Sequence, residues 1–217
     1  MRNNARTAGG SIRAWTGAAM AGLAVVALAA LSGPALAQKA ERPQVKVGDQ
    51  WQFFKSDDRR TPSRSFTWIV TSVTPEGIKG TDNGEPLLLT PDLNVLESAV
   101  RKDSDKRLLS FPLEVGKSWA VEFEFWLKDT GSKGLAKGTA TVRGYEKVRV
   151  HAGEFDAFKL ELKTDAKGRA AAGFDYTAST THTYWYAPSA RMIVREDIVD
   201  SARGPYRIEL TGFKLQP

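Results

Sequence analysis

Apolar and polar residues alternate along most of the chain beyond residue 44, and the pattern is clearest in residues 148–162. Two alternating arms flank the interruption Ala152-Gly153-Glu154. A period of two is typical of half-buried strands, and a short break of small residues is typical of a tight turn. We therefore predict a β-hairpin at 148–162, with Phe155, Phe158, Leu160 and Leu162 facing the core.

Strand-like segments recur on both sides of this hairpin. The turn signal Asn83-Gly84 predicts a second hairpin, and the change of apolar phase at Gly212 predicts a bulge. Residues 91–107 fit either two irregular strands or one short helix, and their pattern does not decide between them. We predict an all-β protein, with residues 45–217 forming one domain. In it, a single curved antiparallel sheet closes into a sandwich or half-barrel. The predicted strands are 45–54, 65–73, 111–127, 139–150, 174–186, 191–199 and 206–215.

The first 37 residues have the composition of a secretory signal peptide. Arg2, Arg6 and Arg13 precede an apolar run at 18–31, and Ala35-Leu36-Ala37 gives a small-residue cleavage site. An uncleaved membrane anchor is the alternative, but the run is short for a span of ~30 Å. We predict a signal peptide at 1–37, a flexible lead-in at 38–44 and no transmembrane segment in the mature protein.

Charge and cysteine content narrow the partners and the location. The formal net charge is +6, and removing the three arginines of residues 1–37 leaves +3, spread among acidic residues. Nucleic-acid binding would need basic residues on one face, so we exclude it. The chain has no cysteine, so neither disulfides nor a lipidated cysteine are expected. The predicted location is the periplasm or the extracellular space, as a soluble protein that is not a lipoprotein.

One strand offers a candidate ligand-binding surface. Tyr176, His182, Tyr184 and Tyr186 share one parity, while Trp185 has the opposite parity. One face must pack in the core, and the other would be an aromatic and hydroxyl surface suited to lipid or carbohydrate. The alternative is that a wide sheet uses aromatic residues on both faces.

Catalytic and metal-binding motifs are weak. His151 and His182, with the carboxylates Glu154 and Asp156, could form a metal site if their strands were neighbours. Their spacing matches no known chelating frame, so we treat them as weak candidates and expect no metal or cofactor. A hydrolase or metal-dependent enzyme that uses these residues remains an alternative hypothesis.

Three motifs carry a resemblance to a known group. They are F-P-L-E-V-G-K-S-W from Phe111, V-H-A-G-E-F-D-A-F-K from Val150, and Y-W-Y-A-P from Tyr184. Together they resemble secreted Gram-negative proteins of unknown function that are grouped as TapB-like, over residues 111–215. The resemblance implies an extracytoplasmic, mainly antiparallel β domain, and it supplies no activity, cofactor or catalytic residue.

These observations favour a periplasmic or secreted non-catalytic binding module, associated with the envelope. Its concave face would hold an apolar or amphipathic ligand, and its partner would be a lipid, a glycan or another envelope protein. Besides the enzyme hypothesis, a purely structural scaffold remains open.

Overall fold

The structure, a computed structural model, describes residues 38–217, and the predicted signal peptide lies outside this part. The described chain consists mainly of strands with one short 3-10 helix, η1 (Pro188–Ala190). The strands are β1 (Lys39–Ala40), β2 (Gln50–Lys55), β3 (Arg64–Thr74), β4 (Gly77–Asp82), β5 (Glu85–Leu89), β6 (Val95–Glu97), β7 (Arg101–Asp103), β8 (Leu113–Glu114), β9 (Ser118–Leu127), β10 (Ser132–Val150), β11 (Gly153–Arg169), β12 (Asp175–Ala187), β13 (Met192–Asp200) and β14 (Gly204–Lys214).

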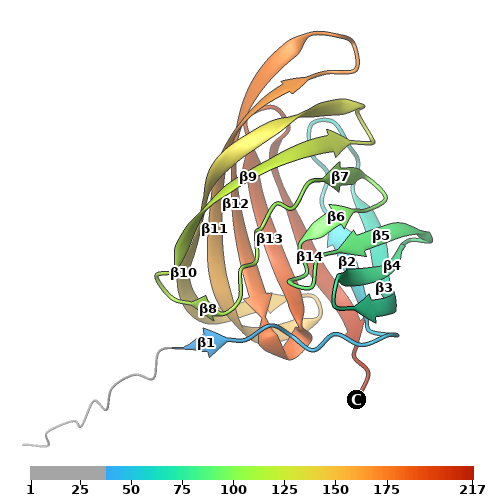
Figure 1. Cartoon of the computed structure of the whole chain (residues 1–217), viewed down its shortest axis with the longest axis vertical. Coiled ribbons are helices and arrows are strands. Elements are labelled where there is room, and N and C mark those ends of the chain that lie inside the picture. The colour runs from blue at the N-terminus through green and yellow to red at the C-terminus, as the bar shows by residue number, and fades with distance from the viewer. Residues whose placement is uncertain (1–37) are drawn as a thin grey trace, which may run out of the picture. The chain divides into compact units, whose positions relative to one another are not determined.

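Twelve of these strands form a closed antiparallel barrel (Figure 1). Its order is β10-β11-β12-β13-β14-β2-β3-β4-β5-β6-β7-β9, and β9 returns to β10. The all-β prediction is confirmed, but the predicted sandwich or half-barrel is wrong. The difference lies in two long-range pairings, β14 with β2 and β7 with β9. They join strands that an open sheet would leave as unpaired edges.

The local turn predictions agree with the structure. Asp82 pairs with Glu85 across Asn83 and Gly84, which have φ angles of 51° and 90°. These left-handed values suit an asparagine-glycine hairpin turn. Val150 pairs with Gly153 across a two-residue turn at His151 and Ala152. The register shift between Leu210 and Gly212 confirms the predicted bulge.

Two segments whose apolar and polar residues show no clear period also form short strands. Residues 91–107 contain two short strands, β6 and β7, rather than a helix. Within the predicted lead-in, β1 pairs with β8. In residues 38–217 no helix has the length and apolar character needed to cross a membrane.

The interior of the barrel is apolar around the β10–β11 turn, and we call this region the apolar end. Trp51, Leu113 and Leu210 are fully buried there, and Phe158 and Tyr186 are each 1% exposed. The Trp51 indole N–H donates a 2.8 Å hydrogen bond to the Ala190 carbonyl, which satisfies a polar group that burial would otherwise leave unpaired. Segment 104–117, between β7 and β9, runs down to β8 (Figure 1) and carries Leu113 into this core.

Candidate functional site

Toward the opposite end the barrel contains a partly open cavity of about 440 Å³. Two features create this space. A barrel widens with strand number, and eight strands already leave an interior that side chains just fill. In addition, the inward residues of β10, β11 and β12 are small at this level: Ala136, Ala166 and Ala178 all line the cavity. At the apolar end the same strands carry large side chains, so that end is filled.

The wall of the cavity is mixed in character. Its apolar surface comes from several aromatic and aliphatic side chains, and its polar surface comes from titratable groups on several elements. The principal apolar residues are Phe53, Phe66, Leu108, Phe123, Met192 and Ile208. The titratable residues central to the wall are Arg101, Asp103, Lys106, His182, Tyr184 and Glu196.

The five candidate ligand-binding residues of β12 fall into three environments. Tyr176, His182 and Tyr184 line the cavity. Tyr186 has the same parity but lies deeper, where its ring packs edge-on against Phe111 at 5.2 Å between centroids. Trp185 points to the outer face of the barrel, and its indole N–H donates to Glu146 at 2.8 Å. Ligand binding by the three cavity residues stays a prediction, and the other two have packing partners of their own.

The polar wall is organised by short contacts. His182 Nδ1 and a Glu196 carboxylate oxygen are 2.7 Å apart, and the His182 and Tyr184 rings are stacked at 5.4 Å. Lys106 Nζ donates to the Tyr184 hydroxyl at 3.0 Å. Arg101 donates twice to one Asp103 oxygen, at 3.0 and 2.7 Å. This cluster brings four elements together: segment 104–117, β7, β12 and β13.

Burial controls the protonation of this cluster. Burial, and secondarily the Arg101 cation, lower the pKa of Lys106 to about 8. Burial also lowers the pKa of His182 in spite of its bond with Glu196, so at neutral pH the ring is uncharged and donates its Nδ1–H. For Glu196, burial favours the neutral acid, but the bond from His182 and the Lys106 charge bring its pKa below the ordinary value. The carboxylate therefore stays ionised, and its acceptor capacity is partly used by His182.

The four candidate metal ligands are not brought together. His151 lies in the β10–β11 turn, with Nδ1 3.0 Å from Glu209. His182 on β12 pairs with Leu162 on β11, and Leu162 lies nine positions along β11 from Gly153, which follows the turn that holds His151. At ~3.3 Å for each strand residue, the two histidines are roughly 30 Å apart. Glu154 and Asp156 instead contact the exposed Lys147. Within residues 38–217 no three potential ligands cluster as a metal site.

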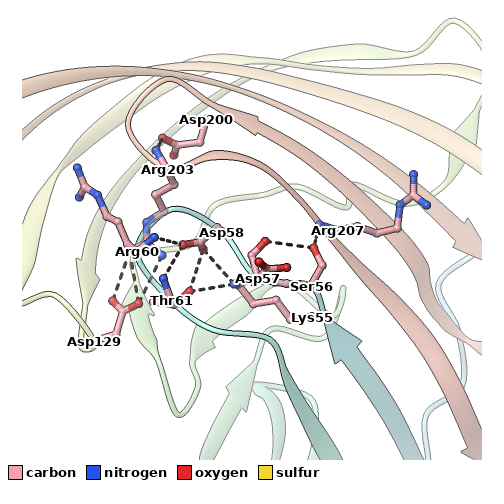
Figure 2. A network of polar contacts seen from close by, with 10 residues as sticks. All are labelled: Lys55, Ser56, Asp57, Asp58, Arg60, Thr61, Asp129, Asp200, Arg203 and Arg207. Carbon is pink, nitrogen blue, oxygen red and sulfur yellow. Dashed lines mark hydrogen bonds and ion pairs between the residues drawn. The ribbon is translucent and has the colours of Figure 1, made fainter.

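A polar network holds the β2–β3 loop beside the cavity, and we call it the mouth network (Figure 2). Lys55 Nζ donates to a carboxylate oxygen of Asp58 and to the Thr61 hydroxyl, each at 2.9 Å. The Asp58 side chain is fully buried and also accepts from the Arg60 and Thr61 amides, both at 2.7 Å. Burial would raise the pKa of Asp58, but these hydrogen bonds lower it well below its ordinary value.

The mouth network continues to two other loops. The Arg59 amide donates to the Arg203 carbonyl in the β13–β14 turn, and the Arg203 guanidinium pairs with Asp129 in the β9–β10 turn at 3.4 Å. Both Arg203 and Asp129 line the cavity. Three turns at this end of the barrel are thus joined by polar contacts.

Sequence reasoning missed Lys106 and Arg101. Lys106 lies on a connecting segment, where strand parity has no meaning, and Arg101 lies on a strand of only three residues. A usable signal existed for Glu196. It shares the inward parity of the buried Ile198 on β13, and a charged residue among inward-facing apolar positions is unusual unless it is paired.

No protein-family model and no curated protein sequence matches the chain. Solved structures that are similar to it include the three that follow. A candidate lipoprotein from Parabacteroides distasonis and a candidate exported protein with a YmcC-like fold from Bacteroides fragilis each cover 81% of this chain and 99% of their own at 14% identity, with TM-scores of 0.49 and 0.48. The hypothetical lipoprotein YmcC from Escherichia coli covers 78% of this chain and 85% of its own at 8% identity, with a TM-score of 0.43.

None of these descriptions names a ligand or an activity, so function has to be argued from the chain itself. The resemblance to TapB-like proteins is not confirmed, because no family model matches. The prediction of a protein that is not a lipoprotein is contradicted by this comparison, in which two of the structures named above are described as lipoproteins. That prediction relied only on the absence of cysteine, which concerns attachment of a lipid through a cysteine side chain.

Proposed function

We propose that the protein is a non-catalytic, envelope-associated module that binds an apolar or amphipathic small molecule inside its barrel. The observation that carries this proposal is the interior cavity of about 440 Å³. Its volume lies within the ~300–1,000 Å³ typical of small-molecule sites, and its wall combines an apolar surface with a few convergent polar groups. The same barrel is densely packed at its apolar end, so the cavity results from the small inward side chains at its own level of the barrel.

A dye-binding measurement with a cavity-filling variant tests the proposal. The neutral dye N-phenylnaphthylamine should bind the purified protein with increased fluorescence. Ala178→Phe places a ring in the cavity and should weaken binding by at least ~10-fold, since overfilling a site excludes its ligand. Thr177→Phe is the matched control on the outward face of β12 and should leave binding unchanged.

Recovery of the native ligand provides a second test. Protein purified from its own envelope, without detergent exchange, should show a copurified small molecule by native mass spectrometry. Equal dye binding by Ala178→Phe and the unmodified protein, together with repeated recovery of empty protein, would overturn the proposal.

A further inference from the structure

In the cavity wall, most charged acceptors already have hydrogen-bond donors from the protein, whereas some charged donors lack acceptors. Three of the wall carboxylates have donors from the protein: Asp103 from Arg101, Glu196 from His182, and Asp200 from the Ala202 and Arg203 amides. Asp82 also lines the cavity and is the exception: its Oδ2 accepts from the Ala99 amide, but its buried Oδ1 has no hydrogen-bond partner among the described residues. The other charged acceptors of the wall are largely satisfied. A ligand that brought only further donors would find few free partners among them.

Lys106 is one of three wall cations for which residues 38–217 supply no ion pair; of the other two, Arg60 is exposed and Arg64 stands over the Phe66 ring at 4.8 Å. The Lys106 ammonium group has three N–H donors, and one of them goes to the Tyr184 hydroxyl at 3.0 Å. Among the described residues no carboxylate lies within ion-pair distance of Nζ, whereas Arg101 is paired with Asp103. The nitrogen also stands 5.6 and 5.5 Å from the centres of the Phe123 and Tyr184 rings. Lys106 thus presents a positive charge with unused donors beside an apolar wall.

We propose that the cavity ligand is an anionic single-chain amphiphile, with a carboxylate head group bound by Lys106 and an acyl chain against the apolar wall. This inference rests on the proposed function and adds the chemical class of the ligand. A carboxylate supplies acceptors only, which matches the unused donors of Lys106. The neighbouring rings and the side chains of Leu108 and Phe123 supply the apolar surface for the chain.

The volume of the cavity limits the size of this ligand. At about 440 Å³, it lies toward the lower end of the ~300–1,000 Å³ typical of small-molecule sites. A saturated carboxylate with a chain of about a dozen carbons meets that limit.

Three probes of equal chain length test the charge preference on purified protein expressed from the full-length sequence. Dodecanoate, dodecanol and dodecyltrimethylammonium are each titrated to displace N-phenylnaphthylamine at pH 7. Dodecanoate should bind ~10-fold more tightly than dodecanol, the usual scale of one hydrogen bond to a charged group. The cationic amphiphile should bind least tightly.

The variant Lys106→Met separates the anchor from the cavity. It should remove the preference for dodecanoate over dodecanol and leave dodecanol binding unchanged, because methionine keeps the apolar stem. Lys102→Met is the matched control, since Lys102 lies on the neighbouring strand with its side chain 59% exposed. It should retain the full preference.

A pH series adds a readout that a structural role would not move. Lys106 loses its proton near pH 8, so dodecanoate affinity should fall between pH 7 and pH 9.5 while dodecanol affinity stays level. Lys106→Met should remove this dependence. The charged and titratable groups around Lys106 are Arg101 and Asp103 on β7, His182 and Tyr184 on β12, Glu196 on β13 and Tyr206 on β14.

The possible failures are distinguishable. If none of the three probes binds, the proposed function fails and this inference fails with it. If dodecanol binds as tightly as dodecanoate, the cavity function stands and the anionic preference is overturned. If Lys106→Met keeps the preference, the ligand is anionic but Lys106 is not its anchor.

Discussion

The two ends of the barrel use the same strands for opposite purposes. On β11, the inward residues Phe158, Leu160 and Leu162 fill the apolar end, whereas Thr164 and Ala166 farther along the strand border the cavity. On β12, Tyr186 packs in the core, whereas Ala178 and Thr180 leave space. The difference is made by side-chain size and polarity at the same parity. Stability should therefore depend mainly on the apolar end, and ligand recognition on the hollow one.

The largest change in the free energy of unfolding is expected for a substitution in the apolar end. Phe158 is 1% exposed and packs edge-on against Tyr145, with ring centroids 4.8 Å apart. Phe158→Ala should lower the free energy of unfolding by about 3–5 kcal/mol, the usual range for a buried phenylalanine that leaves a cavity. Urea denaturation followed by fluorescence measures this loss. Phe174→Ala is the control, because Phe174 is 61% exposed, and a comparable loss there would contradict the comparison.

An intermediate effect is expected at the mouth network. Asp58→Ala removes the carboxylate that accepts from Lys55 and from the Arg60 and Thr61 amides. Leaving these donors unsatisfied should lower the free energy of unfolding by about 1–3 kcal/mol, and protease cleavage within 56–63 should become faster. Asp57→Ala changes an exposed neighbour and should do neither.

The pH dependence of this effect has a definite sign. Because the folded-state pKa of Asp58 is lowered, its contribution is present above its ordinary pKa and is lost as pH falls through the folded value. The difference between Asp58→Ala and the unmodified protein should therefore be full at pH 7 and shrink on strong acidification. A difference that grows in acid would show that Asp58 is not held as the carboxylate.

The same comparison shows what sequence pattern could predict. Period-two alternation located the long strands, and the Asn83-Gly84 turn and the Gly212 bulge were predicted because each depends on local backbone conformation. Closure of the barrel was not predicted, since it depends on β6 and β7, which have only three residues each and no measurable period. Parity placed Tyr176, His182 and Tyr184 on one face, but it gives no depth along the barrel. For that reason Tyr186 could not be separated from the cavity residues.

A smaller effect, of opposite sign, is expected at Lys106. The Lys106 side chain is half-buried and has no ion pair within residues 38–217, and replacing a poorly compensated interior charge by an apolar side chain is often stabilising. Lys106→Met should raise the free energy of unfolding by about 1–2 kcal/mol at pH 7. The gain should shrink toward pH 10, because the lowered pKa lets the folded protein release this proton before the unfolded chain does. Denaturation of both proteins at the two pH values checks this, and a loss of stability at pH 7 would mean that Lys106 is structural.

The smallest effect is expected at His151, and it tests whether the apolar end depends on packing alone. His151 stands at the turn that closes this end, yet its side chain is 65% exposed and its one ion-pair partner is Glu209. Exposed ion pairs contribute about 0–1 kcal/mol, so His151→Ala should change the free energy of unfolding by less than about 0.5 kcal/mol. The turn itself should persist, because Gly153, with its φ of 133°, and the bond from the Ala152 amide to the Leu210 carbonyl are untouched. A loss approaching that of Phe158→Ala would mean that the turn, rather than the packed interior, holds the apolar end together.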